Sequence, residues 1–197
     1  MTTVGQVSTL LLIISFLAGS LKAQSTSGWE RYTTAWVVRS TQYGGKPTSL
    51  TLLPKSLKRP KSGVRLVIPK KNMLVQHDNE SRYIKMYLIN SSSDTILVDR
   101  ADATVIGIST EVFADGEWKI FQTITGSSCG NSYWKMTMQP KNFLYIELEN
   151  KTKGPLKALY RVRLKTANLD VISNATTIYL TPELLRLAGT TPPAISL

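Results

Sequence analysis

The stretch Leu156–Leu164, "LKALYRVRL", decides the fold class of this chain. Its apolar side chains stand at every second position, and these are Leu156, Ala158, Tyr160, Val162 and Leu164. The positions between them carry one lysine and two arginines, with Leu159 as the exception. Because successive side chains of a β-strand point to opposite faces, the pattern predicts a strand with one buried face and one face in water.

The same period of two continues on both sides of this stretch. It is clear in 82–90 ("RYIKMYLIN"), 133–139 ("YWKMTMQ") and 143–149 ("FLYIELE"). Shorter strands are predicted at 35–40, 65–68, 95–99, 104–113, 117–122 and 176–180. Turn residues separate the strands, and Asp115-Gly116 is the strongest hairpin signal among them. No helical pattern lies between the strands, which predicts an antiparallel β-sandwich or barrel.

One short helix is predicted near the C-terminus, in "TPELLRLAG". Thr181 suits the N-cap, Pro182 the first helical position, and Gly189 the residue that ends the helix. The predicted organisation is a signal peptide over 1–23, an N-terminal arm with a basic loop over 24–62, a β-sandwich over 63–182, and a short helix with a tail over 183–197.

Residues 8–20, "STLLLIISFLAGS", form an uncharged apolar run that is too short to span a bilayer. Ala23 follows as a small residue at a suitable cleavage position, so the run predicts a secretory signal peptide. The segment before the run has no lysine or arginine, and a permanent N-terminal anchor is the alternative. We expect an exported protein, periplasmic or extracellular, with no transmembrane segment in its mature part.

The sequence holds few candidates for catalysis. Cys129 is the single cysteine and His77 the single histidine, and they lie about fifty residues apart. A cysteine nucleophile needs a base beside it, and a structural zinc site needs four ligands. The carboxylates are scattered and show no calcium-loop spacing. We therefore predict a non-enzyme without metal or cofactor, in which Cys129 is a small loop residue or the partner of an intermolecular disulfide.

Several short motifs follow one another in order over residues 103–180. A G-x-W element in a hairpin precedes an L-x-P-like strand entry, a glycine turn and a closing strand with Tyr-Arg; the residues are Gly116, Trp118, Met138, Pro140, Gly154, Leu156, Lys157, Tyr160 and Arg161. This order resembles bacterial immunoglobulin-like domains of secreted and cell-envelope proteins of the Bacteroidetes type. The resemblance implies an immunoglobulin-like β-sandwich with adhesion-like or accessory roles. The chain lacks the cysteine pair of antibody-type domains.

A basic segment, residues 55–71, carries no acidic residue and accounts for much of the net charge of +11. Its cations are Lys55, Lys58, Arg59, Lys61, Arg65, Lys70 and Lys71. Such a cluster attracts polyanions, here anionic polysaccharide, lipid head groups or DNA. Aromatic residues that would stack on bases are missing from it, so specific nucleic acid recognition is not predicted. The alternative is a solvated loop whose lysines protect a sheet edge.

Other residues extend these surface hypotheses. Arg161, Arg163 and Lys165 would widen the basic patch if their strand lies beside it. Tyr83, Tyr87 and Tyr145 would form a sugar-binding platform if exposed, or pack under a loop if buried. Glycosylation sequons begin at Asn79, Asn90, Asn150 and Asn174, and they matter only in a source that glycosylates.

Three functional hypotheses result from the sequence. The first is an exported, non-catalytic β-sandwich that acts as an interaction or structural module of the cell envelope. The second is a polyanion-binding protein that uses residues 55–71. The third is an enzyme of a type without a recognisable motif.

Overall fold

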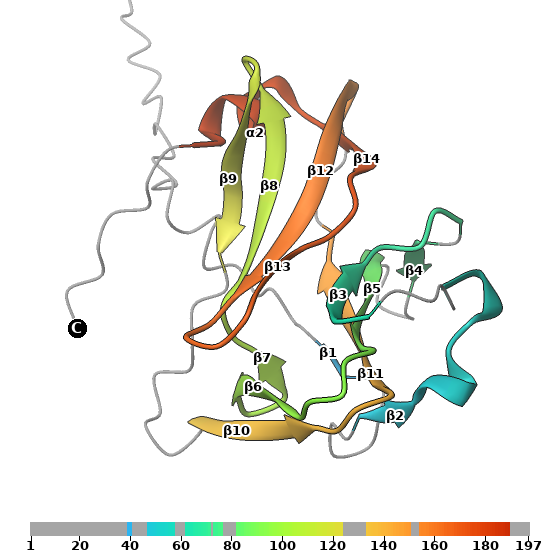
Figure 1. Ribbon diagram of the computed structural model, residues 1–197. Coiled ribbons are helices and arrows are strands. Elements are labelled where there is room, and N and C mark those ends of the chain that lie inside the picture. Colours follow the sequence, from blue (N-terminus) through green and yellow to red (C-terminus); the bar gives the residue numbers. More distant parts are fainter. Residues whose placement is uncertain are drawn as a thin grey trace, which may run out of the picture.

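The computed structural model describes residues 39–40, 47–57, 62–71, 73–76, 82–123, 133–150 and 154–189. Every strand pairing in these ranges is antiparallel, and the strands form three sheets around one apolar core. The predicted fold class, an all-β antiparallel sandwich with a short C-terminal helix, is confirmed. Figure 1 shows two sheets facing each other, with a smaller third sheet at one end.

The first sheet, here sheet A, has six strands in the order β1–β11–β5–β3, with β2 beside β11 and β4 beside β5. Its strands are β1 (Arg39–Ser40), β2 (Thr48–Ser49), β3 (Val64–Val67), β4 (Leu74–Gln76), β5 (Arg82–Asn90) and β11 (Asn142–Glu149). Two 3-10 turns, η1 (Leu50–Leu52) and η2 (Lys55–Leu57), follow β2. Residues predicted as an N-terminal arm thus contribute β1 and β2 to sheet A.

The second sheet, sheet C, has five strands in the order β13–β12–β8–β9, with β14 also on β12. Its strands are β8 (Ile108–Ala114), β9 (Glu117–Thr123), β12 (Leu156–Lys165), β13 (Asp170–Ile172) and β14 (Thr176–Leu180). The predicted β8–β9 hairpin is confirmed, and Asp115 and Gly116 adopt φ values of 53° and 83° at its tip. Helix α2 (Pro182–Leu187) follows β14, and the Thr181 side chain caps it by accepting from the backbone of Leu184.

The third sheet, sheet B, consists of β6 (Ile96–Ala101), β7 (Thr104–Val105) and β10 (Tyr133–Met138). It continues sheet A around a corner, because β5 leads into β6 and β10 leads into β11. Asn90 lies at this corner and is completely buried. Its side-chain amide donates to the carbonyls of Met138, which ends β10, and of Gln139, which follows it, each at 3.2 Å. The chain therefore passes between sheet A and sheet B at one place, both from β5 to β6 and from β10 to β11.

The alternating row that identified the central strand lies in the core as predicted. Tyr160, Val162 and Leu164 of β12 are at most 1% exposed, whereas Leu159 on the opposite face is 47% exposed. Burial of one large apolar side chain contributes about 1.5–3 kcal/mol. The same core takes side chains from all three sheets, including Met86 of β5 and Met138 of β10.

Two strand predictions need correction. The stretch 104–113 was predicted as one strand, but it divides into β7 and β8, which lie in different sheets. The turn between them contains Gly107, whose φ is +79°, and a Cβ there would stand 2.3 Å from the carbonyl oxygen of Lys165. The period of two over 133–139 places Trp134 in one row with Met136 and Met138, but Trp134 is 42% exposed whereas the two methionines are at most 4% exposed. Its ring lies over the guanidinium of Arg100, 5.2 Å from the ring centre.

Candidate functional site

A pocket of about 790 Å³ lies where sheet A and sheet C meet along one side of the sandwich. β3 is the last strand of sheet A on that side, and β13 is the last strand of sheet C. The lining residues are Ser56, Leu57, Val64, Arg65, Leu66, Val67, Ile68, Pro69, Lys70, Lys71, Asp170, Val171, Ile172 and Asn174. The volume is within the range of small-ligand sites, about 300–1,000 Å³.

The apolar part of the pocket forms because β3 is anchored on both faces. Leu66 and Ile68 point into the main core and are 3% and 1% exposed. On the other face of sheet A, Leu57 of η2 packs in a second cluster that includes Ile89 and the partly buried Val67. The short segment 50–57 is thereby held against the outer face of sheet A and supplies one wall of the pocket.

Asn174 lines the pocket and bonds to the backbone of Ile68, the residue that follows β3. Its Oδ1 accepts from the Ile68 N–H at 2.9 Å, and its Nδ2 donates to the Ile68 carbonyl at 3.0 Å. The preceding residue, Ser173, is tied to β12, because its N–H donates to the Val162 carbonyl at 2.8 Å. Asn174 therefore links sheet C to the edge of sheet A.

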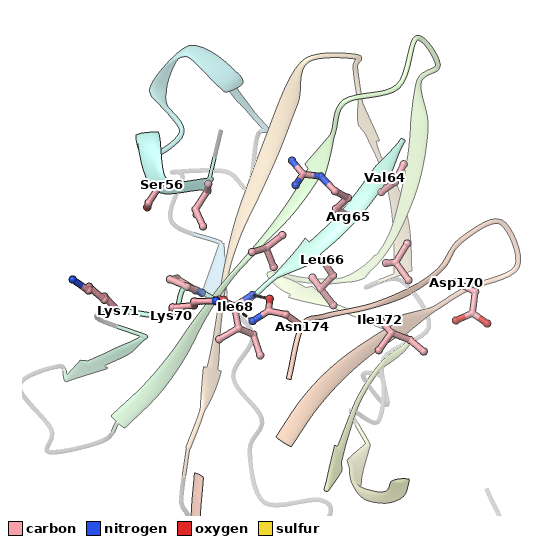
Figure 2. A pocket seen from close by; sticks show the side chains of 14 residues that line it. Ser56, Val64, Arg65, Leu66, Ile68, Lys70, Lys71, Asp170, Ile172 and Asn174 are labelled. Atoms are coloured by element: carbon pink, nitrogen blue, oxygen red, sulfur yellow. Dashed lines mark hydrogen bonds between the residues drawn. The ribbon is translucent and has the colours of Figure 1, made fainter. Parts of the chain in front are cut away.

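Three cations of the basic segment line this pocket, namely Arg65, Lys70 and Lys71. Figure 2 shows Arg65 and Leu66 leaving β3 in opposite directions, and Lys71 extending away from the other lining side chains. Lys70 and Lys71 are exposed, and no carboxylate in the described part of the chain forms an ion pair with either of them. The basic segment is therefore partly a wall of this pocket, and its cations lie beside the apolar residues of the lining.

Among the described residues that line the pocket, Asp170 is the single carboxylate, and it is already paired. Arg163 of the neighbouring strand β12 donates to both of its oxygens, at 2.8 and 2.6 Å. Hydrogen bonding from Arg163 holds the pKa of Asp170 below its ordinary value, so Asp170 stays charged and engaged with Arg163. The carboxylate consequently offsets little of the positive charge of the lysines.

The remaining predicted basic residues have different outcomes. Lys55 lies exposed on η2, next to the pocket-lining Ser56. Lys58, Arg59 and Lys61 lie outside the described residues. We predicted that Arg161, Arg163 and Lys165 would widen the basic patch if their strand lies beside it. Their strand, β12, does lie near the pocket, because it pairs with the pocket-lining β13.

The arginines of β12 add little net charge to the patch, because each is paired with a carboxylate. Arg163 is held by Asp170, as described above. Arg161 bonds to Glu111 at 2.5 Å and lies 4.1 Å from the centre of the Trp118 ring. Lys165 is exposed at the end of the strand.

The hypothesis of a sugar-binding tyrosine platform required three exposed tyrosines, and it is wrong because none of the three is exposed. Tyr83 is 2% exposed. Tyr87 and Tyr145 are half-buried and pack edge to face, with ring centres 5.2 Å apart. The Tyr145 hydroxyl donates to Glu147 at 2.8 Å, and burial together with this bond raises the pKa of Tyr145 well above its ordinary value. These tyrosines are packing residues of sheet A.

The candidate catalytic residues Cys129 and His77 lie outside the described residues. Within the described ranges, no group of three histidine, cysteine, aspartate or glutamate side chains is arranged to hold a metal ion. The same ranges contain no helix with the length and apolar character needed to cross a membrane.

The sequons differ in what their asparagines do. The Asn90 side chain is buried and its Nδ2, the atom a glycan would occupy, donates to three carbonyls. The Asn174 side chain bonds to Ile68. Asn79 lies outside the described residues, and Asn150 follows β11 and is half-buried. Asn90 is thus a structural residue, and a glycan on the folded chain would have to displace its hydrogen bonds.

Sequence reasoning missed the part of this site that sheet C supplies. β13 and Asn174 come from the stretch 170–174, "DVISN", which is too short for a periodic signal and was not predicted as a strand. This stretch is about 100 residues from β3 in the chain, and the two meet only because sheet A packs against sheet C. The one available signal was a pair of β-branched residues, Val171 and Ile172, after an acidic residue.

Comparison with known proteins adds one structural neighbour. No protein-family model matches the chain, and no curated protein matches it. Among solved structures, the chain is similar to the archaellum periplasmic stator protein FlaG from Sulfolobus acidocaldarius, with 15% sequence identity and a TM-score of 0.29. The match covers 58% of this chain and 99% of that chain. A similarity at this level assigns neither a family nor a function.

Proposed function

We propose that this protein is an exported, non-catalytic binding module that holds an anionic partner of the cell envelope in the pocket between β3 and β13. The observation that carries the proposal is the joining of Arg65, Lys70 and Lys71 to an apolar floor in one pocket. The sequence led to two separate hypotheses, an interaction module and a polyanion-binding protein. This proposal combines them, because the interaction module would bind its partner through the basic residues of the pocket.

The chemistry of the lining selects the partner. Exposed lysines raise the local concentration of anions through their field, and this attraction is screened by salt. Aliphatic side chains such as Leu66 and Ile172 bind the apolar part of a ligand by removing it from water. Because Asp170 is engaged by Arg163, it does not repel an incoming anion at full strength. The ligand class is therefore an anion that also carries apolar groups.

The other parts of the proposal rest on the sequence. The apolar run at residues 8–20 supports export. The ordered motifs between Gly116 and Arg161 support an immunoglobulin-like module of the bacterial envelope type. The non-catalytic role rests on the spacing of Cys129 and His77, which lie about fifty residues apart and show no nucleophile motif.

The test is a charge reversal in the pocket with a matched reversal elsewhere. Lys70→Glu/Lys71→Glu changes the net charge by the same amount as Lys135→Glu/Lys157→Glu, whose lysines are exposed on β10 and β12. We expect the pocket variant to elute from a heparin column at clearly lower salt than the control variant, since only it removes cations from the site. Equal elution of the two variants would show that the net charge acts without a site, and the proposal would fail.

A further inference from the structure

The backbone of β3 shows which of its hydrogen-bonding groups face the pocket. The Ser91 N–H donates to the Gly63 carbonyl at 2.9 Å, so Gly63 faces β5. In an antiparallel pair, alternate residues exchange both bonds with the partner strand, and the residues between them point the other way. Arg65 and Val67 therefore face β5, whereas Val64 and Leu66 present their N–H and C=O groups on the opposite edge.

Asn174 confirms this alternation independently. Ile68 is the next residue in the outward-facing series, and both its N–H and its carbonyl bond to the Asn174 side chain on the edge away from β5. A primary amide presents one acceptor and one donor side by side, as a backbone amide pair does. Asn174 thus occupies one position where a neighbouring strand would bond.

The pocket runs along this edge. All residues of 64–71 line it in succession, although neighbouring side chains of a strand point to opposite faces. Only a cavity that follows the edge of a strand touches both of its faces. Among the described strands, β5 alone pairs with β3, and β13 lies beside the edge without a ladder of hydrogen bonds to it. The outward groups of Val64 and Leu66 therefore lie on the edge that the pocket follows.

We infer that the ligand of this pocket is an extended acidic segment of a partner protein, which adds to β3 as a strand. This inference rests on the proposed function and specifies the partner. Strand addition supplies affinity through the main chain, and pockets for alternate side chains supply specificity. The added strand would bond to Val64 and Leu66 and end at the position that Asn174 already occupies.

The two faces of β3 specify the side chains of the partner segment. Side chains on the inner face would lie against Leu66 and Ile172 and should be aliphatic. Side chains on the outer face should be acidic, because the end of the segment beside Asn174 would lie nearest to Lys70 and Lys71. A second copy of this chain is a poor occupant, because each copy carries a net charge of +11.

A peptide that alternates valine and glutamate over eight residues is the probe, and its valine–lysine counterpart is the charge control. We expect the acidic peptide to slow hydrogen exchange at the amides of Val64 and Leu66 by at least about tenfold. The amides of Arg65 and Val67 should change much less, because they already bond to β5. This alternation distinguishes strand pairing from any ligand that only covers the surface.

Two N-methylated twins of the acidic peptide test the main-chain bonds directly. Methylation of the valine nitrogens blocks one edge of the peptide, and methylation of the glutamate nitrogens blocks the other. We expect one twin to lose at least about tenfold in affinity and the other to keep the affinity of the parent. If both twins bind as tightly as the parent peptide, strand addition is wrong.

A backbone variant provides a second test. Val64→Pro removes an outward N–H, which is not part of the ladder with β5, so the fold should persist. We expect it to weaken binding of the acidic peptide at least about fivefold relative to Val64→Ala, which keeps the N–H. If Val64→Pro unfolds the chain, hydrogen exchange at the Val64 and Leu66 amides of the unaltered protein, with and without the acidic peptide, still tests whether a strand is added.

The outcomes separate this inference from the proposed function. One outcome is that heparin or vesicles of anionic phosphatidylglycerol bind through Lys70 and Lys71 while the acidic peptide does not bind. That result would support the proposed anion site and refute the strand partner. If none of the probes binds, both fall. If the Val64 and Leu66 amides exchange as slowly as those of Arg65 and Val67 before any peptide is added, the edge is already covered by this chain or a second copy, and the inference is overturned.

Discussion

Replacing Asn90 with alanine should lower the free energy of unfolding by about 2–4 kcal/mol, because its amide joins two strands where both change sheets. The side chain is 0% exposed. Its Nδ2 donates to the carbonyls of Asp94 at 2.8 Å, Met138 at 3.2 Å and Gln139 at 3.2 Å. Its Oδ1 accepts from the Ser92 N–H at 3.1 Å and from the Ser92 hydroxyl at 2.6 Å.

The magnitude follows from which of these groups water can reach in the variant. The bond to Met138 lies in the buried interior, and an acceptor left there without a donor costs about 1–3 kcal/mol. The bonds to Asp94, Gln139 and Ser92 are nearer the surface, where water replaces the amide, so their loss adds about 1 kcal/mol in total. For a chain of this size, the sum corresponds to a fall of roughly 4–16 °C in Tm.

Urea unfolding followed by tryptophan fluorescence measures this loss. Asn168→Ala is the matched control, because Asn168 is exposed and its hydrogen bond to the Thr166 hydroxyl uses the backbone N–H, which alanine keeps. We expect the control to change the free energy of unfolding by less than about 0.5 kcal/mol. A loss below about 1 kcal/mol for Asn90→Ala would refute the reasoning, since it would mean that the corner does not depend on this amide.

Three other contacts lead to predictions. Arg161→Ala should cost about 2–3 kcal/mol in urea unfolding, because it leaves the buried Glu111 carboxylate without its partner, and Glu111→Gln in the same chain should recover part of that loss. Arg163 lowers the pKa of Asp170, so the pair stabilises the fold above about pH 4 and this contribution is lost as the pH falls through the lowered pKa; the Tm of Asp170→Asn should therefore decline less between pH 5 and pH 2 than that of the unaltered protein. Gly107→Ala should lower the Tm by several degrees, because its φ is +79° and a methyl group would meet a carbonyl oxygen at 2.3 Å.

The local elements could be predicted because their causes lie within a few residues. The alternation in Leu156–Leu164 required β12, whose inner row is buried. Asp115-Gly116 required a tight hairpin because both positions adopt positive φ. Thr181 before Pro182 specified where the C-terminal helix begins. In each case, one side-chain period or one backbone conformation was sufficient.

The division of the strands among three sheets could not be predicted in the same way. The period of two in 104–113 is continuous, yet Gly107 turns the chain from sheet B into sheet C. Glu147 sits at a position that the pattern assigns to water, but it is 5% exposed because Tyr145 bonds to it and β1 pairs across it. Such outcomes depend on which distant strand becomes the neighbour, and a local pattern does not specify that neighbour.

The sequence by itself determined that this is an all-β chain with a concentrated positive charge at residues 55–71. Charge and side-chain period are properties of single segments, and they persist in any fold that the chain adopts. Only the tertiary structure decided that this charge borders an apolar pocket, that Arg163 engages Asp170, and that Asn174 closes the edge of β3. The pocket and the Asn174–Ile68 contact join segments about 100 residues apart, which meet because sheet packing buries apolar surface from both. The Arg163–Asp170 pair forms because β13 pairs with β12.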